Sequence, residues 1–306
     1  MLPKATTETG KGVDGLLLVD KPAGVSSHDV VNAARRRFGE RRIGHAGTLD
    51  PFATGLLVLL LGRATRLAQY VNDEPKEYVG EVLFGAETET EDLLGAVTRT
   101  APLPTADELK AIATLFTGRI SQVPPAYSAK RIEGKRAYEL ARSGAEVELK
   151  AVEVQIHSLS FESFTEAGGR VSSCRIRVAC GGGTYIRSLA RDIARAVGSA
   201  AHLTSLRRER AGVFSLGRSV PLERLREGEG TLAPPVDALE GYPVQPLSDD
   251  EVAKVTRGID VEARVEGKFA ALVESRGSGE LVAFAERRPS ERGDRWQPRV
   301  VMRGES

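Results

Sequence analysis

The chain has 306 residues, of which 41% are hydrophobic and 28% charged, a composition typical of an ordinary globular protein with one large and one small domain. No apolar run reaches the roughly 18 residues of a membrane-spanning helix, and Cys174 and Cys180 alone are too few for a disulfide scaffold or a zinc site. We therefore expect a cytoplasmic protein without a membrane partner, and the net charge of +1 does not by itself indicate nucleic acid.

The beginning of the chain is predicted to contain a disordered tail, a strand and a helix. Residues 1–12 are polar and rich in glycine, threonine and lysine, which is typical of a tail. The apolar run at 15–19 predicts a short strand. A helix follows, because Ser26 can cap its start and Gly39 lies just past its end.

The next part of the chain predicts a loop, two strands and a second helix. Residues 44–51 are loop-like, and the glycine-bounded apolar run at 56–61 has the length of a buried strand. Residues 78–84 predict another strand. Thr105 opens a capping box, and the helix that it starts is expected to run to Gly118.

Residues from about 122 to 152 have the composition of an insertion or a lid. Two adjacent prolines exclude regular structure near its start. The remainder is basic and polar, with a short helical pattern at 137–142. The alternating segments 152–164 and 171–180 then predict a pair of strands.

The segment 184–197 predicts an amphipathic helix with a basic stripe. Arg187, Arg191 and Arg195 are spaced four residues apart, which places them on one side of a helix. Arginine is also clustered at 35–37 and 41–42 and around 207–210. The planar guanidinium suits phosphate, so these clusters indicate local basic patches in a nearly neutral protein.

The chain contains more arginine than lysine, with 33 arginines among 43 basic residues. A codon bias toward arginine explains this total as well as a nucleic-acid partner does. The clusters therefore carry more weight than the total.

The last sixty residues predict a separate small β unit. A stretch dense in glycine and proline at 228–246 separates it from the rest. Ser248 opens another capping box, whose helix ends at Gly258. Four strand-like runs follow, at 259–265, 268–274, 280–286 and 298–302.

The common signatures of nucleotide hydrolases, dinucleotide-binding enzymes and zinc enzymes are absent from the sequence. The histidines are too scattered to suggest a metal site: His28, His45, His157 and His202. A metal enzyme or a nucleotide hydrolase is therefore disfavoured.

The segment from His45 to Pro51 is the strongest candidate for a catalytic loop. Pro51 pushes Asp50 out of the helical region, so that this carboxylate lies on an extended or turn backbone. Gly47 and Gly55 permit tight bends on either side. A lone aspartate before proline is more often only a turn former.

Several segments in order resemble the successive motifs of the TruB family, which makes pseudouridine at position 55 of tRNA. Each block alone is weak evidence, but the ordered set over roughly residues 15–215 is specific. The matching segments are 21–27, 45–51, 62–66, 76–78, 122–129, 180–187 and 203–212.

The resemblance implies an α+β fold with a mixed β-sheet core flanked by helices. The catalytic domain would span residues 13–245, with an RNA-contacting insertion at about 122–152. Residues 246–306 would form a small PUA-like RNA-binding domain, or a β cap without an RNA role. The implied partner is the T-arm of tRNA, bound by a monomer that needs no metal, cofactor or protein partner.

The same resemblance assigns catalytic roles to Asp50, Tyr78 and Arg187. Isomerisation breaks the glycosidic bond, and a carboxylate can attack or stabilise C1′ as positive charge develops there. Asp50 would be that carboxylate, paired with Arg187. Tyr78 would stack on the flipped uracil and act in proton transfer, although a core aromatic is the ordinary interpretation.

The resemblance also implies substrate-binding residues, each of which has an ordinary structural alternative in the core, in a loop or in solvent. His45 would fill the gap left by the flipped base, and Lys21 would hold the Asp50 loop or a phosphate. Arg191 and Arg195 would be surface residues or phosphate contacts. The substrate-binding set is Lys21, His45, Arg66, Tyr185, Leu203 and Lys130.

Three positions depart from the family's common pattern. Arg66 stands where lysine is frequent, and Gly181 replaces a frequent serine. The stretch 88–92 is more acidic than usual. None of these is expected to touch Asp50, Tyr78 or Arg187.

Two other classes of function remain open. One is an RNA-binding protein that keeps the fold without catalysis, which the intact catalytic set argues against. The other is a guide-RNA-dependent subunit of the dyskerin-like branch, whose long lysine-rich tails are missing here.

Overall fold

The computed structural model describes residues 13–71, 73–127, 149–276, 279–291 and 293–302, and the backbone of 131–132 and 135–136. The expected tail at 1–12, the short helix at 137–142 and Lys130 lie outside these residues.

The predicted helices and strands that lie among the described residues form in the predicted order, although the helix expected to run to Gly118 ends at Ile112. The strands at 86–88, 97–100 and 118–122 and the central strand at 201–211 are not among those predicted. Along the chain the elements are β1 Gly15–Lys21, α1 Ser27–Phe38, β2 Ile43–Ala46, β3 Thr54–Leu61, η1 Gly62–Leu67, β4 Lys76–Phe84, β5 Ala86–Thr88, β6 Val97–Thr100, α2 Ala106–Ile112, η2 Ala113–Phe116, β7 Gly118–Gln122, β8 Arg131–Ile132, β9 Lys135–Arg136, β10 Val152–Ala167, β11 Arg170–Cys180, α4 Ile186–Ala196, β12 Ala201–Ala211, β13 Phe214–Ser215, η3 Leu216–Arg218, β14 Val220–Pro221, α5 Leu222–Arg226, η4 Pro235–Leu239, β15 Val244–Leu247, α6 Asp249–Thr256, β16 Val261–Glu262, β17 Phe269–Glu274, β18 Leu281–Arg288 and β19 Arg295–Val301.

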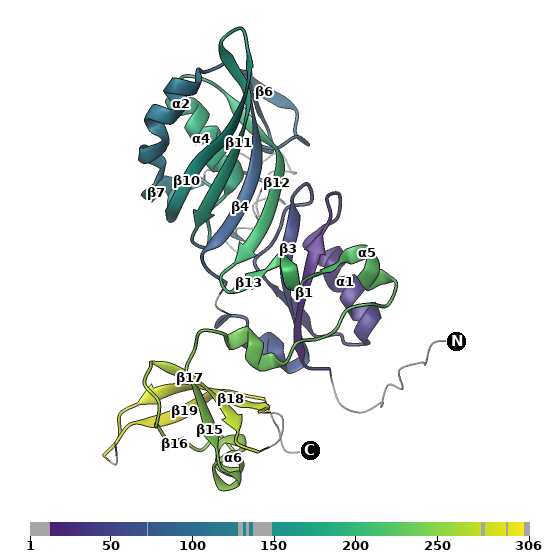
Figure 1. Ribbon diagram of the computed structural model, residues 1–306, viewed down its shortest axis with the longest axis vertical. Coiled ribbons are helices and arrows are strands. Elements are labelled where there is room, and N and C mark those ends of the chain that lie inside the picture. Colours follow the sequence, from purple (N-terminus) through teal and green to yellow (C-terminus); the bar gives the residue numbers. More distant parts are fainter. Residues whose placement is uncertain are drawn as a thin grey trace.

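A long mixed sheet forms the body of the protein (Figure 1). Its strands run in the order β14-β1-β3-β12-β4-β11-β10-β7, with β2 paired to β3 and β13 paired to β12. The β1–β14 and β3–β12 pairs are parallel, and the other pairs are antiparallel. The expected α+β class with a mixed sheet is confirmed.

Strand β3 is apolar on both faces because both faces are covered. Leu57, Leu59 and Leu61 join the cluster that includes apolar residues of α1 and α4. The alternating residues Leu56, Val58 and Leu60 join a second cluster with the C-terminal sheet. Successive strand residues point to opposite faces, so the continuous apolar run reflects burial on both sides.

The helices lie along the body of the sheet in two groups. In Figure 1, α2 and α4 lie beside β10, β11 and β12. The helices α1 and α5 lie beside β1 and β3. The capping boxes of α1, α2 and α6 are present as expected, on Ser26, Thr105 and Ser248.

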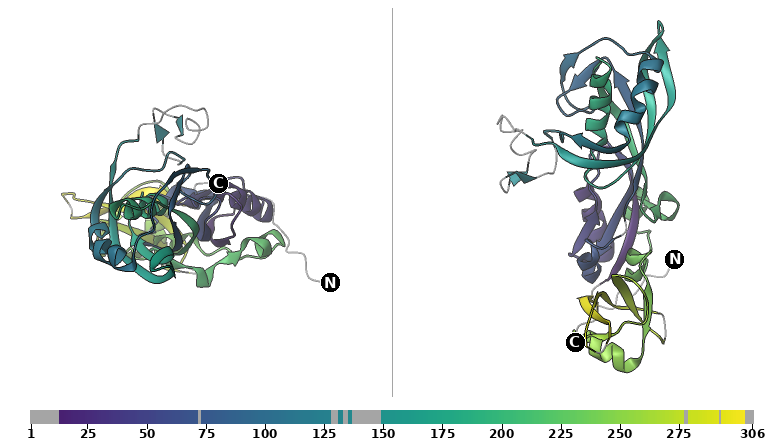
Figure 2. Two further views of the ribbon diagram at one scale, coloured as in Figure 1. Left: turned by 90° about the horizontal axis from the view of Figure 1, so that it is seen from above. Right: turned by 90° about the vertical axis from the view of Figure 1, so that its left-hand side faces the viewer.

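The C-terminal unit is a five-stranded sheet with α6 packed against it, and it lies at one end of the molecule (Figure 2). Its order is β15-β17-β18-β19-β16. Because β15 begins at Val244, the expected domain boundary at residue 246 falls inside this strand. The unit is fastened to the body by Arg63, whose Nη1 donates to Met302 O at 2.6 Å.

One expectation about the loop before β3 needs correction. Residues 44–51 are not all loop, because β2 pairs with β3 in register from Ile43 to Ala46. The apolar Ile43 and Ala46 are buried, and this pairing satisfies the backbone of the edge of β3. The irregular part therefore begins at Gly47.

No helix in the described parts of the chain is both long and apolar enough to cross a membrane.

Gly55 is expected to tolerate no side chain, because β12 approaches β3 closely there. A Cβ at this position would lie 2.2 Å from Arg208 O, and φ is +101°. We expect Gly55→Ala to lower the free energy of unfolding by roughly 3 kcal/mol, measured by urea denaturation. Gly217→Ala is the control, since a Cβ there meets nothing within 4 Å. Equal stability of the two variants would contradict this account of the close approach.

Candidate active site

The loop that carries Asp50 is held against the start of α1 by backbone and side-chain hydrogen bonds. Ser27 Oγ donates to Leu49 O at 3.0 Å and accepts from Leu49 N at 2.9 Å. Gly24 N donates to Pro51 O at 2.8 Å. The residues on both sides of Asp50 are thus fixed, which positions its carboxylate without using its oxygens.

Lys21 fastens the same loop from β1. Its Nζ donates to Val25 O at 2.8 Å and to Pro51 O at 3.4 Å, and the residue is fully buried. Burial lowers the pKa of Lys21 to about 8, with Asp50 opposing and Arg208 adding to that shift. The ammonium is still mostly protonated at pH 7. Of its two expected roles, the structure shows the contact with the Asp50 loop.

Asp50 and Arg187 meet in the structure as the resemblance implied. Arg187 Nε lies 2.9 Å from Asp50 Oδ2, with 4% of the arginine side chain and 34% of the aspartate side chain exposed. The Nε atom makes no hydrogen bond within the described residues, so this contact is an ion pair without directed geometry. The exposed third of the Asp50 side chain is accessible to a substrate.

Arg187 is aimed at Asp50 by two carbonyl groups from distant segments. Its Nη1 donates to Thr90 O at 2.6 Å, and its Nη2 donates to Tyr127 O at 3.0 Å. Asp92 lies 3.9 Å from Nη1. The expectation that the acidic stretch 88–92 does not touch Arg187 is therefore wrong. This stretch forms the turn after β5, which packs against the start of α4.

The basic stripe on α4 differs from the expectation at Arg191. Arg191 is buried and forms an ion pair with Glu91, which also accepts from Ser188 Oγ at 2.7 Å. Arg195 pairs with Glu87 at 2.6 Å. Burial raises the pKa of Glu91, and Arg191 opposes that effect. Arg191 is thus buried against a carboxylate, whereas Arg195 stays at the surface, as expected, with 53% of its side chain exposed while it pairs with the buried Glu87.

Tyr78 lies beside a buried arginine that sequence reasoning did not single out. Arg208 is 1% exposed, and its guanidinium donates to Leu56 O at 2.7 Å and Gly47 O at 3.1 Å. Tyr78 and Arg208 are paired in register across β4 and β12. Burial raises the pKa of Tyr78, and Arg208 partly opposes this. The tyrosine hydroxyl is therefore protonated at neutral pH.

The alternation of side chains along a β-strand could have indicated that Arg208 is buried. Leu206 and Arg208 are two residues apart on β12, so they share one face, and both are buried. The sequence pattern predicts one basic patch of Arg207, Arg208 and Arg210, but the structure buries Arg208. Arg207 instead pairs with Asp20 at 2.7 Å.

The other residues expected in the site lie on separate elements. His45 is on β2, and burial, followed by Arg208 and His28, lowers its pKa. Tyr185 precedes α4, where its backbone exchanges hydrogen bonds with Gln122 at 2.8 and 3.1 Å. Leu203 is fully buried in the core cluster that includes Tyr78.

Arg66 lies on η1 and reaches toward the C-terminal sheet. Its Nη1 donates to Val301 O at 2.9 Å. Within the described residues Arg66 forms no hydrogen bond or ion pair with the Asp50 loop. The structure thus groups Asp50, Arg187, Tyr78 and Lys21 but does not bring Arg66 to them.

This arrangement supports carboxylate chemistry on an anionic substrate. Three buried cations, Lys21, Arg187 and Arg208, surround the half-exposed Asp50 loop, and the field that they create favours negative charge. No cluster of histidine, cysteine and acidic residues suited to a metal ion occurs among the described residues. The site therefore contains two groups suited to catalysis, the carboxylate of Asp50 on a fixed loop and the buried phenol of Tyr78.

Comparisons of the chain with known proteins identify its family. The TruB family pseudouridylate synthase (N terminal domain) matches residues 35–186. The tRNA pseudouridine synthase B of Paenarthrobacter aurescens is 43% identical over 254 residues, which cover 82% of each chain. That of Thermobifida fusca is 41% identical over 290 residues, covering 89% of this chain and 99% of the relative.

Solved structures share the fold. An H/ACA RNP bound to a substrate RNA containing 2′-deoxyuridine aligns with a TM-score of 0.68 at 23% identity, covering 94% of this chain and 85% of that one. A Cbf5-Nop10-Gar1 complex aligns with a TM-score of 0.67 at 24% identity, covering 95% and 85%. These likenesses include the C-terminal sheet, so the expected overall architecture is confirmed.

Proposed function

The chain belongs to the TruB family of pseudouridylate synthases, and from this premise we propose that it isomerises uridine to pseudouridine at position 55 in the T-loop of tRNA. The observation that carries this proposal is the Asp50–Arg187 ion pair, in which the carboxylate is one-third exposed on a fixed loop. The relatives named tRNA pseudouridine synthase B support tRNA as the substrate.

The reaction is a rearrangement that needs no oxidant or reductant. The N1–C1′ bond of uridine breaks, the uracil turns over, and a C5–C1′ bond forms. C5 loses its proton, and N1 ends with one. A carboxylate beside C1′ lowers the barrier by attacking it or by stabilising its developing positive charge. We assign this role to Asp50, with Arg187 as its ion-pair partner.

Tyr78 and the other cations complete the proposed site. The phenol lies in the core beside Arg208, so its ring can stack on a flipped base while its protonated hydroxyl takes part in proton transfer. Lys21 positions the Asp50 loop. Tyr185 and Leu203 flank the start of α4 and the core behind Tyr78, which supports roles as pocket walls.

We further propose that the chain before β15 forms the catalytic domain and that the C-terminal unit, which begins with β15 at Val244, contacts RNA. The insertion at about 122–152, with Lys130, would contact RNA as well. The protein would act as a monomer in the cytoplasm without a protein partner, metal or cofactor.

A single assay tests this function against its alternatives. The purified protein alone is incubated with an unmodified tRNA transcript, and pseudouridine is mapped by chemical derivatisation. We expect modification at position 55. Binding without modification would favour an RNA-binding protein, and modification only after addition of guide RNA and partner proteins would favour the dyskerin-like branch.

Removal of His45 is expected to weaken productive RNA engagement more than the chemistry. Because burial lowers its pKa, the imidazole is neutral at pH 7 and can replace a flipped base in the stack. His45→Ala should raise KM about tenfold, corresponding to part of a stacking energy of about 1–3 kcal/mol, with a smaller change in kcat. His45→Phe should be milder.

The exposed His157 on β10 provides the control variant His157→Ala. Steady-state kinetics on tRNA and on an isolated T-arm hairpin make the comparison. Unchanged kinetics of His45→Ala on both RNAs would show that His45 is only a structural histidine.

A further inference from the structure

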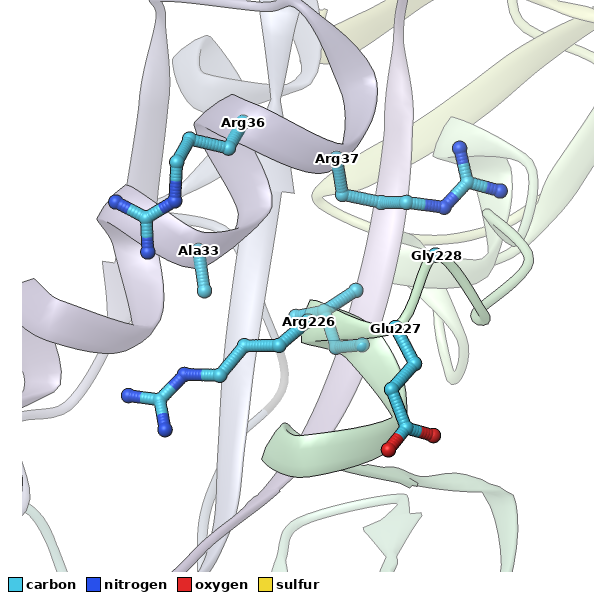
Figure 3. A pocket seen from close by; sticks show the side chains of 7 residues that line it. Ala33, Arg36, Arg37, Arg226, Glu227 and Gly228 are labelled. Carbon is cyan, nitrogen blue, oxygen red and sulfur yellow. The ribbon is translucent and has the colours of Figure 1, made fainter.

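A basic hollow lies between α1 and α5, away from the Asp50 carboxylate. It has a volume of about 430 Å³ and separates the C-terminal half of α1 from the end of α5. Figure 3 shows Arg36 on α1 and Arg226 on α5 extending from opposite walls toward the same side. Arg37 and Glu227 lie at its other edges.

The two facing arginines differ from most others in this protein. Arg36 and Arg226 are exposed and form no ion pair with a carboxylate in the described parts of the chain. By contrast, Arg224 on the same short helix pairs with Glu229 at 2.5 Å. Arg37 donates to the Glu229 carbonyl at 3.3 Å. Two guanidinium groups facing one hollow without acidic partners fit an external anion.

The acidic groups nearby do not neutralise this hollow. Asp29 lies within electrostatic range of Arg226, but its carboxylate accepts from Ser26 N and Oγ at 2.8 and 2.7 Å in the capping box of α1. Glu227 is the one acidic residue that lines the hollow. Further uncompensated charge comes from the exposed Arg41 and Arg42 just beyond α1.

Helix α1 connects the hollow to the catalytic loop. Its first residue, Ser27, holds Leu49 beside Asp50, and Arg36 lies nine residues further along the helix. At about 1.5 Å per residue this separation is about 14 Å. An RNA stem-loop that places a base at Asp50 is much larger than this, so its backbone can reach the hollow.

We propose that the hollow between α1 and α5 binds backbone phosphates of the RNA substrate, outside the loop that enters the Asp50 site. Planar guanidinium groups hold phosphate oxygens in pairs, and such contacts position an RNA without reading its sequence. This inference rests on the proposed function for the identity of the RNA. The simpler alternative is that the arginines only offset the dipole of α1 at its C-terminal end.

The test measures RNA affinity independently of turnover. In the Asp50→Asn background, the dissociation constant for unmodified tRNA is determined between about 50 and 200 mM salt by filter binding. We expect Arg36→Ala with Arg226→Ala to raise Kd about tenfold at the higher salt. The slope of log Kd against log salt should fall by about 1.5, because two phosphate contacts are lost.

Two further variants make the result specific. Arg224→Ala removes one charge outside the hollow from the helix that carries Arg226, and its Kd should stay within twofold of the parent. Arg36→Lys with Arg226→Lys keeps the charges and should recover most of the salt slope. In the wild-type background, the double alanine variant should raise KM and leave kcat unchanged.

The proposal is overturned if the double alanine variant binds within twofold of its parent, if its salt slope is unchanged, or if Arg224→Ala is equally harmful. A loss of thermal stability without a change in Kd would support the helix-dipole alternative. Failure of the proposed function is a separate outcome, because it shows as absent pseudouridine in the wild-type protein, whereas Kd depends on no catalytic step.

Discussion

Replacing Asp50 by asparagine is expected to lower kcat for pseudouridine formation by at least about a thousandfold while leaving the Kd for tRNA within about threefold. Asparagine keeps the size of the side chain but cannot attack C1′ or stabilise positive charge there. The backbone of the loop should persist, because Ser27 and Lys21 hold it through Leu49 and Pro51 rather than through Asp50.

Single-turnover kinetics and filter binding on a tRNA transcript make this measurement. Asp20→Asn is a matched control. Asp20 lies on β1 and, like Asp50, pairs with an arginine, because Arg207 Nη2 lies 2.7 Å from its carboxylate. A thermal melt separates loss of chemistry from the effect of leaving the buried Arg187 without its partner. Residual kcat within tenfold of wild type would remove Asp50 from the catalytic role.

Tyr78→Phe is expected to lower kcat by about a hundredfold or more, with little change in tRNA affinity. Phenylalanine keeps the ring in the core cluster and therefore its stacking face. It loses the hydroxyl beside Arg208. Because burial raises the pKa of Tyr78, the wild-type hydroxyl stays protonated through neutral pH.

The control for this variant is Tyr70→Phe, in an aromatic cluster where the Tyr70 and Phe284 ring centroids are 4.6 Å apart. Rates are compared under single-turnover conditions, and Kd is measured in parallel. A kcat within threefold of wild type would show that the Tyr78 hydroxyl takes no part in proton transfer, leaving the ring with a packing role alone.

Elements with local signals were predicted well. The helices that begin after Ser26, Thr105 and Ser248 form where expected, since a capping residue and its partner three positions later act within one turn. Strand β3 was recognisable because its apolar run had strand length between two glycines. The ordered motifs identified the family, which the comparisons confirm.

The sequence determined the family, and through it the fold class and the candidate Asp50, and it determined the capped helices and strand β3, because these depend on the order and local chemistry of neighbouring residues. Only the tertiary structure decided which charges meet. Arg191 pairs with Glu91 across 100 residues, and Arg208 binds the carbonyl of Leu56 across 152. A helix or strand carries the same pattern of arginines whether its face meets water or a carboxylate. The fate of each charge therefore depends on which distant segment the fold brings against it.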